Sequence, residues 1–178
     1  MSTINSGRVE NSSQAAVSIL SQRWLIVGGA AAVASLVAAL AISLTARNNP
    51  DVTSAAALFA RLLITAIFFI SGIQKIVWPS WALDYISSVG LPFAPIGLVI
   101  GIGMELVGGS ALALGYETRV VAALFVGYCV ASAAFFHRDF HDENQLMNFF
   151  KNIAMAGGLL QIIAFGPGNF SLDAAWTG

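Results

Sequence analysis

Charged side chains are scarce in this sequence of 178 residues: they make up 10% of it, while 57% of the side chains are hydrophobic. A water-soluble domain carries about 25% charged residues, because its surface must be covered with polar groups. The scarcity excludes a soluble globular domain and predicts a membrane protein in contact with a lipid bilayer. The formal net charge is −1, so no positive excess points to a nucleic-acid partner.

Cysteine and histidine are nearly absent as well. Cys129 stands alone, which excludes an internal disulfide and a C-x-x-C redox pair. A haem held by two histidines would consume both His137 and His141, which lie close together at the end of one apolar run. The sequence also carries no flavin or iron–sulfur motif. We therefore expect no intrinsic cofactor.

Long apolar runs dominate what is present. Residues 1–23 are polar and without periodicity, which indicates a flexible tail, and residues 174–178 form a second tail. Each apolar run between them is long enough to cross about 30 Å of hydrocarbon as a helix. The expected spans are 24–45, 54–77, 92–114 or 95–114, 120–136 and 147–165. The sequence thus predicts an all-α membrane protein with five transmembrane helices, the last four of which (54–173) form a four-helix bundle.

The stretch Arg61–Pro79 has a cation near each end and no charge between Arg61 and Lys75. A charge at bilayer depth costs about 2.5–3.5 kcal/mol on insertion scales, so it usually faces the bundle and has a partner. With 3.6 residues per turn, Arg61, Phe68, Gly72 and Lys75 share one face, which we expect to point inward. An aromatic loop with Trp78, Trp81 and Tyr85 follows at the membrane surface.

Antiparallel threading of the helices predicts which polar residues meet. Lys75, His137, Lys151 and Asn152 fall at one level of the membrane, and Arg61 lies about 21 Å from Lys75 along the helix axis. Glu105 is the only carboxylate within the expected spans and lies near mid-depth. It is the natural counter-ion for one of the cations, and a buried pair needs further hydrogen bonds, which Gln74 and Asn152 would supply.

These residues form the predicted site. Glu105 and His137 are the candidates for proton transfer, and the candidate ligand-binding residues are Arg61, Gln74, Lys75, Lys151 and Asn152. The alternative is that the charges are structural, with Lys75 and Lys151 reaching the membrane interface from their helix ends. His137 and His141, with their flanking carboxylates, have the residue types for a zinc or iron site. We favour a solvated loop there and predict no metal.

Several short stretches, in this order and spacing, match a known family over about Ala57–Asp173. They are Arg61 with Ser71–Lys75, Gly90–Pro92, Glu105–Gly109, Leu114–Arg119, Phe136-His137, Phe150–Asn152 and Gly166–Asp173. On these residues the chain resembles the DoxX family of small bacterial and archaeal membrane proteins. The resemblance implies a four-helix bundle in the bacterial inner membrane, to which residues 24–45 add a helix. It also implies a link to electron transfer, because some relatives are associated with quinol oxidases or thiosulfate:quinone oxidoreductases and others with oxidative-stress assemblies.

Three functions follow as hypotheses. The first is an accessory membrane subunit of a respiratory or other electron-transfer complex, bordering a quinone site. The second is a quinone-interacting subunit of a membrane oxidoreductase, in which Lys75, His137 and Lys151 would donate hydrogen bonds and Glu105 would relay protons. The third is a small anion or solute permease that uses its embedded charges. Electrons would come from a larger partner complex in either of the first two.

Overall fold

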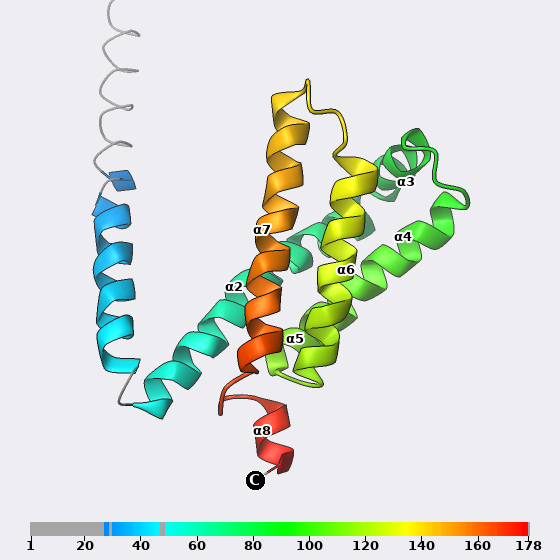
Figure 1. The fold of residues 1–178 in the computed structure, drawn as a ribbon. Helices are drawn as coiled ribbons and strands as arrows, with labels where there is room; N and C mark the ends of the chain where they lie inside the picture. Colours follow the sequence, from blue (N-terminus) through cyan, green and yellow to red (C-terminus); the bar gives the residue numbers. More distant parts are fainter. Residues whose placement is uncertain (1–26, 29, 47–48, 178) are drawn as a thin grey trace, which may run out of the picture. The chain divides into compact units, whose positions relative to one another are not determined.

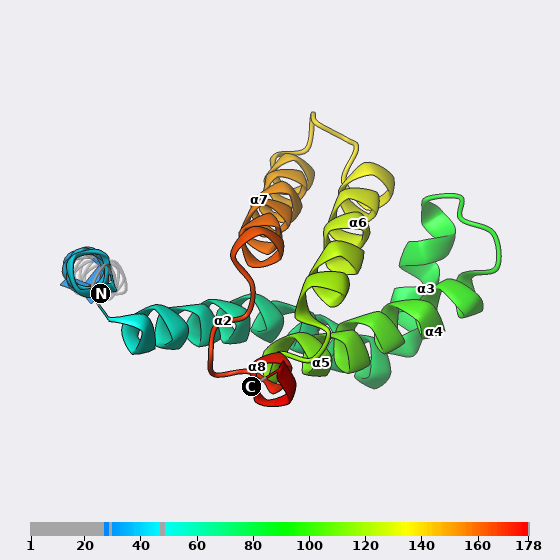
Figure 2. The ribbon, with the colours of Figure 1, turned by 60° about the horizontal axis from the view of Figure 1, so that its bottom comes forward.

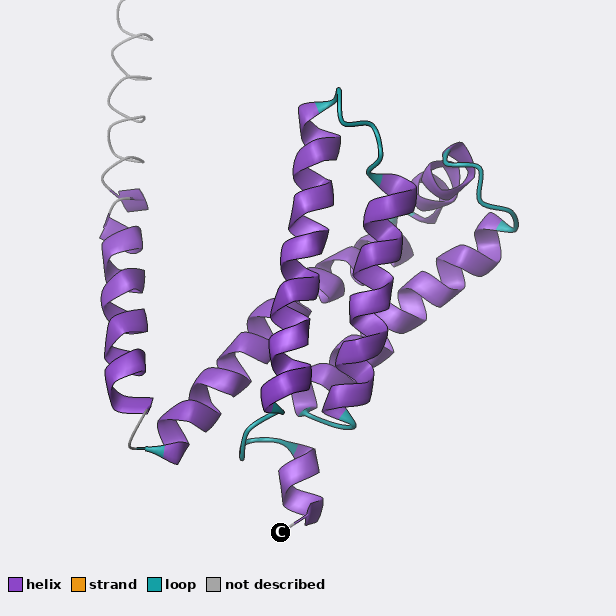
Figure 3. Ribbon diagram, viewed as in Figure 1, coloured by secondary structure: helices purple, strands orange, loops and turns teal. Residues whose placement is uncertain are grey.

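The computed structural model describes residues 27–28, 30–46 and 49–177. The chain divides into two compact units, residues 1–48 and residues 49–178. All regular elements of the described residues are helices (Figure 3). The prediction of an all-α protein is therefore confirmed.

In the first unit, the structure describes an apolar helix, Ala30–Ala46. It ends one residue beyond the span predicted for residues 24–45, and its valine, leucine and isoleucine side chains are largely exposed. An apolar helix with exposed side chains is suited to lipid or to another helix, and unsuited to water. The predicted tail, 1–23, lies outside the described residues, as do residues 24–26.

The second unit begins with helix α2, Pro50–Val77. Asn49 caps it, because its side chain accepts a hydrogen bond from the backbone N–H of Asp51 at 3.0 Å, and Pro50 occupies the first helical position. The helix ends at Val77, since Pro79 disfavours helical backbone at Trp78. Its buried face carries Arg61 and Phe68, as the 3.6-residue period predicts.

The aromatic segment after α2 differs from the predicted loop. Residues Pro79–Ser88 form helix α3, which Pro79 opens at its first position. Ala82 and Ile86, one turn apart, pack on Leu98 of the following helix and form a small second core. Burial of this apolar face explains why a segment rich in interfacial aromatics folds as a helix.

The next membrane span, Ala94–Leu114, consists of three helical pieces. Helix α4 covers Ala94–Gly103, a π-helical turn η1 covers Met104–Gly108, and α5 covers Gly109–Leu114. In the π turn the N–H of Gly109 donates to the carbonyl of Met104, five residues earlier. Such turns are rare and occur often at functional sites. Glu105 lies inside this one.

Helices α6 (Thr118–Phe136) and α7 (Glu143–Phe165) complete the spans. Asp142 caps α7 by accepting from the N–H of Asn144 at 2.9 Å, so α7 starts one turn earlier than predicted. The chain then turns through Gly166 and Gly168 into a short helix α8, Leu172–Thr177. Residues 174–177, which we predicted to belong to a tail, therefore lie in a helix.

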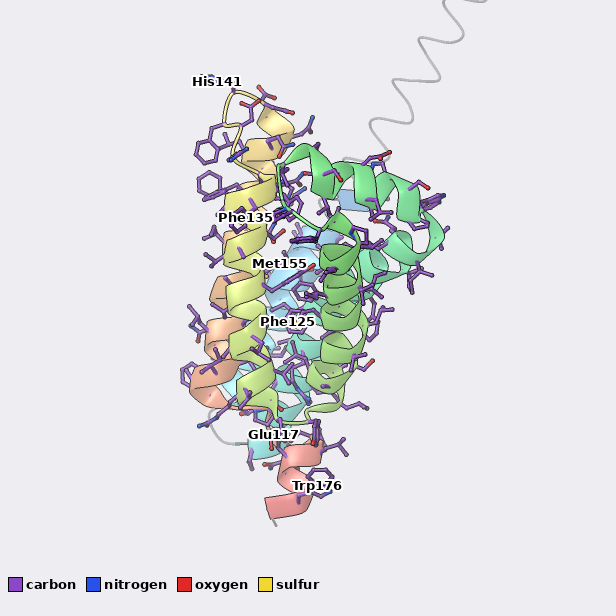
Figure 4. The ribbon with its side chains drawn as sticks, turned by 90° about the vertical axis from the view of Figure 1, so that its right-hand side faces the viewer. Glu117, Phe125, Phe135, His141, Met155 and Trp176 are labelled. Carbon is purple, nitrogen blue, oxygen red and sulfur yellow. The ribbon has the colours of Figure 1, made fainter. Side chains whose placement is uncertain are left out.

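Within this second unit, α6 and α7 run side by side, and α2 runs along α4 and α5 (Figures 1 and 2). The main core lies where the two pairs meet, around Phe68, Leu112, Phe125 and Leu159. Figure 4 shows Phe125 between the helices, with His141 and Trp176 at opposite ends of the bundle. Among the described residues, four helices are long and apolar enough to cross a membrane, which confirms the four predicted spans of the bundle.

Candidate functional site

An ion pair lies inside the bundle. The Lys75 ammonium on α2 is 2.8 Å from both carboxylate oxygens of Glu105 in η1. The Glu105 side chain is 3% exposed and that of Lys75 is 19% exposed. Glu105 is thus the counter-ion of Lys75, whereas the sequence left open which of the cations it would neutralise.

Two hydroxyl groups complete the coordination of the carboxylate. Ser71 donates to Glu105 Oε1 at 3.0 Å, and Tyr128 of α6 donates to the same oxygen at 2.7 Å. Ser71 also accepts from Lys75 Nζ at 2.7 Å. Oε1 therefore receives three hydrogen bonds and Oε2 receives one, from Lys75. A buried pair needs such additional bonds to offset the loss of hydration.

The helix geometry explains how these groups meet. Ser71 and Lys75 are four residues apart on α2, so they project from the same face. Gly72 lies between them, and a Cβ atom there would come within 2.7 Å of the Leu106 side chain and 3.3 Å of Glu105 Cβ. The missing side chain lets η1 approach α2 closely enough for a direct lysine–carboxylate contact.

A cavity of about 510 Å³ adjoins the pair. All of the predicted site residues except Arg61 line it: Gln74, Lys75, Glu105, His137, Lys151 and Asn152. Ser71 and Tyr128 line it too. Its walls come from α2, α3, α4, η1, α6 and α7, so the cavity lies between the helix pairs of the second unit. Its volume is typical of sites for small ligands and cofactors.

Aromatic rings form one wall of the cavity. Trp81 and Tyr85 of α3 stack with ring centroids 5.7 Å apart and planes 6° apart. Tyr85 stacks in turn on Phe136 at 5.4 Å, and its hydroxyl donates to the Phe136 carbonyl at 3.1 Å. The rings that we predicted to lie in an interfacial loop are thus held by α3 against the site. The three rings give the cavity an apolar, aromatic wall.

A second group of polar residues in the cavity comes from the α6–α7 end. His137 Nδ1 lies 2.9 Å from Gln145 Oε1, which fixes the orientation of the imidazole ring. Lys151 reaches Asn148 Oδ1 at 3.4 Å, and Asn152 donates to the Asn148 carbonyl at 3.0 Å. The predicted hydrogen bonds from Gln74 and Asn152 to the ion pair are replaced by those of Ser71 and Tyr128.

Arg61 lies elsewhere. It is fully buried, and its guanidinium donates to the carbonyls of Leu112 (3.3 Å), Ala113 (3.2 Å) and Phe170. Leu112 and Ala113 are in the last turn of α5, where the carbonyls lack the usual helical donor, and the Gly115 N–H reaches only that of Leu112, at 3.3 Å. Arg61 Nε–H has no acceptor among the described residues. The geometry makes Arg61 the cap of a helix end.

Asp173 is a matching cap that sequence reasoning missed. Its carboxylate accepts from the N–H groups of Glu117 (2.7 Å) and Thr118 (2.9 Å) and from the Thr118 hydroxyl (2.6 Å), at the start of α6. Burial acts to raise the pKa of Asp173, but these hydrogen bonds and the positive charge of Arg61 lower it by more, so the pKa lies below its ordinary value.

Two further candidates, the histidine pair as a metal site and a second hollow as a binding site, are weaker than the cavity. His141 is exposed and its backbone N–H bonds Asp139, and no three metal-ligating side chains come together in the described part of the chain. An open hollow of about 660 Å³ lies at the α2–α3 corner, lined by Gln74, Val77, Trp78, Pro79, Ser80 and Trp81. It has no ionisable side chain, so the cavity beside Glu105 is the stronger candidate site.

The fold and the site define a small multi-pass membrane protein with a buried lysine–glutamate pair beside a cavity. The DoxX family model matches residues 56–138. Inner membrane protein YphA of Escherichia coli is 31% identical, over 65% of this chain and 86% of that protein. Inner membrane protein YqjF of the same organism is 33% identical, over 65% of this chain and 88% of that protein.

The chain therefore belongs to the DoxX family, and it is a protein of the bacterial inner membrane. The names of both relatives give a location and no activity. No solved structure matches the chain significantly.

Proposed function

We propose that this protein is an accessory membrane subunit of an electron-transfer complex and that its cavity binds the headgroup of a quinone. One observation carries the proposal: the Lys75–Glu105 pair, with its hydroxyl partners Ser71 and Tyr128, borders a cavity with a stacked aromatic wall. A purely structural ion pair needs neither the cavity nor the rings.

The chemistry of a quinone headgroup fits this arrangement. The ring is planar and apolar, which suits the aromatic wall formed by Trp81, Tyr85 and Phe136. Its two carbonyl oxygens need hydrogen-bond donors, which His137 and Lys151 in the cavity lining would supply, because the ammonium of Lys75 already bonds Ser71 and Glu105. The apolar tail needs a lipid-facing exit, and the cavity is also lined by Ile67 and Ile70, which are 45% and 59% exposed.

Reduction of a quinone also takes up protons, and Glu105 is positioned to pass them. Its Oε2 receives a bond from Lys75 only, which leaves acceptor capacity on the carboxylate. Lys75 balances the negative charge that Glu105 carries once the carboxyl has given up its proton. His137 is the second candidate, since Gln145 holds one ring nitrogen and leaves the other for a ligand.

The proposal also requires a partner protein. The sequence contains no haem, flavin or iron–sulfur motif, so electrons for a bound quinone would be delivered by another protein. The chain would then contribute the membrane side of a shared site. This makes the subunit and quinone hypotheses parts of one proposal.

The quinone site is tested by fluorescence in lipid nanodiscs. A variant keeps Trp81 and replaces the other tryptophans by phenylalanine, so a quinone in the cavity quenches its emission. We expect saturable quenching by a short-chain ubiquinone, with a Kd at least tenfold higher in Glu105→Gln. The control is Glu117→Gln, whose carboxylate is exposed at the other end of the bundle and whose Kd should be unchanged. Quenching that never saturates, or that Glu105→Gln leaves intact, would overturn the site.

The partner is tested by affinity purification from native membranes in mild detergent. We expect a larger membrane complex to travel with both the unchanged chain and Glu105→Gln, and quinone-linked turnover to be lost only in the variant. Recovery of the chain alone would contradict the subunit proposal. Full turnover in a complex with Glu105→Gln would reduce the role to assembly.

A further inference from the structure

The charges inside the cavity do not cancel. Its lining contains the ammonium groups of Lys75 and Lys151 and one carboxylate, Glu105. Lys75 and Glu105 neutralise one another at 2.8 Å. With His137 neutral, the cavity keeps one positive charge, on Lys151.

Lys151 has no carboxylate partner. The carboxylate in the cavity lining, Glu105, is paired with Lys75. Lys151 Nζ makes a long hydrogen bond, 3.4 Å, to the amide oxygen of Asn148, which is a neutral group. The acidic residues nearest in sequence, Asp142 and Glu143, do not line the cavity, and Asp142 caps α7.

Lys75 cannot take over the role of Lys151. Its ammonium already bonds Ser71 at 2.7 Å and both oxygens of Glu105 at 2.8 Å. A ligand that drew Lys75 away would leave the buried Glu105 carboxylate without its counter-ion, which is strongly unfavourable. Lys151 is therefore the cation available to a ligand.

We propose that the cavity prefers ligands whose planar ring carries an ionised oxygen, and that Lys151 determines this preference. The inference rests on the proposed quinone site and specifies the charge state that the site favours. The ring lies on the aromatic wall, and its ionised oxygen pairs with the Lys151 ammonium in place of Asn148. A neutral ring makes the same stacking contacts but leaves Lys151 without a counter-ion.

The competing explanation is that Lys151 serves only the membrane interface. Lys151 is exposed, and it follows the start of α7 by about 12 Å, within reach of the interface for a long side chain. On that explanation the charge of the ligand is irrelevant to its affinity. Because the ammonium is exposed, the preference for an anion is modest, about fivefold.

Two probes of similar shape separate the explanations: methylnaphthoquinone, which is neutral, and hydroxynaphthoquinone, whose hydroxyl is ionised at neutral pH. Binding of each is measured by quenching of Trp81 in the full-length variant that keeps only this tryptophan, in nanodiscs of zwitterionic lipid. The anion partitions less into lipid, so the readout is the ratio of the two Kd values compared between variants. That comparison cancels partitioning.

We expect the Kd of the neutral probe divided by the Kd of the anion to be about fivefold higher in the unchanged chain than in Lys151→Gln. Lys151→Arg should keep the preference, and so should Arg138→Gln, which removes an exposed cation outside the cavity. Asn148→Asp should abolish it without removing the lysine, because it places a carboxylate beside Lys151. This variant keeps the test valid if Lys151→Gln fails to fold.

The outcomes separate the two proposals. If neither probe quenches saturably, the quinone site itself is wrong and the inference falls with it. If both bind and the ratio is the same in Lys151→Gln and Asn148→Asp as in the unchanged chain, the quinone site stands and the role of Lys151 is overturned.

Discussion

Helix α2 carries two cations in the membrane span, and their surroundings differ completely. Arg61 is fully buried and donates only to backbone carbonyls, at the end of α5 and in the segment before α8. Lys75 is partly exposed, pairs with a carboxylate and borders a cavity. The same helix therefore holds one cation in a closed structural joint and another in an open site.

The Arg61 end is a joint between three segments. Arg61 caps the end of α5, and Asp173 caps the start of α6 across the tight turn at Gly115. Asp173 N–H also donates to the Gly115 carbonyl at 2.9 Å. The two cations differ in the groups that they bond: Arg61 bonds backbone carbonyls, whereas Lys75 bonds a carboxylate and the Ser71 hydroxyl and borders a cavity. Replacing residues at each end tests this distinction.

The largest effect should come from Arg61→Met. The carbonyls of Leu112, Ala113 and Phe170 would each lose the hydrogen bond from Arg61, and Leu112 would keep only the one from the Gly115 N–H. At about 1 kcal/mol for each lost bond, we expect a loss of about 3 kcal/mol in the free energy of unfolding. Arg61→Lys should lie in between, because an ammonium reaches fewer carbonyls. Thermal unfolding in detergent measures both. A stable Arg61→Met that no longer binds quinone would place Arg61 in the site and break the comparison.

Gly115→Ala should cost slightly less, about 2–3 kcal/mol. Gly115 has φ +74°, where a side chain costs about 1–2 kcal/mol, and the new methyl group would also collide with the Arg61 guanidinium and with Ser171. Gly127→Ala is the matched control, since no atom lies within 4 Å of its added methyl group. Equal unfolding temperatures for the two variants would show that the joint is looser than described.

Glu105→Gln should have a smaller effect on stability, about 2 kcal/mol, because the unpaired Lys75 can turn toward the cavity. Quinone binding should be lost with it. Adding Lys75→Met should restore most of the stability, since no lone charge remains, but should not restore binding. If the double variant regained binding as well, the pair would be a structural element like Arg61.

Much of this arrangement could be predicted from the sequence. The helical period placed Arg61, Phe68, Gly72 and Lys75 on one inward face, and antiparallel threading brought His137, Lys151 and Asn152 to the level of Lys75. Such positions can be predicted because the face on which a residue lies depends on its own helix alone. The level at which it lies depends on the short turns between the helices.

The partners of the charges could not be predicted in the same way. Ser71 and Tyr128 are ordinary residues within apolar runs, and their roles depend on helix rotation and on the π turn at Glu105. One signal was available: Ser71 precedes Lys75 by four residues, so it shares the lysine's face. The role of Asp173 depends on the return of the chain after Gly166 and Gly168, which have φ of +81° and +78° and which no periodic pattern describes.

The smallest and most specific effect should be the pH dependence of the Asp173 cap. The pKa of Asp173 in the folded protein lies below its ordinary value of about 4, because the hydrogen bonds from Thr118 and Glu117 and the charge of Arg61 outweigh the opposing effect of burial. A carboxyl with a lowered pKa stabilises the fold fully above its unfolded-state pKa, and this contribution is lost as the pH falls through the folded-state pKa. The stabilisation should therefore be constant from pH 7 to about 5 and decline below about 4.

Asp173→Ala, which removes the cap, should cost about 1 kcal/mol at pH 7, as other helix caps do. Unfolding temperatures of the unchanged chain and Asp173→Ala, measured side by side from pH 7 to pH 3, should differ by a constant amount and then converge below pH 4. Asp84→Ala is the control, because its exposed carboxyl caps no helix end, and its difference from the unchanged chain should stay small throughout. Curves for Asp173→Ala that stay parallel down to pH 3 would mean that the carboxylate charge contributes nothing to the joint. The joint at the Arg61 end would then depend on the arginine alone, with no electrostatic contribution from Asp173.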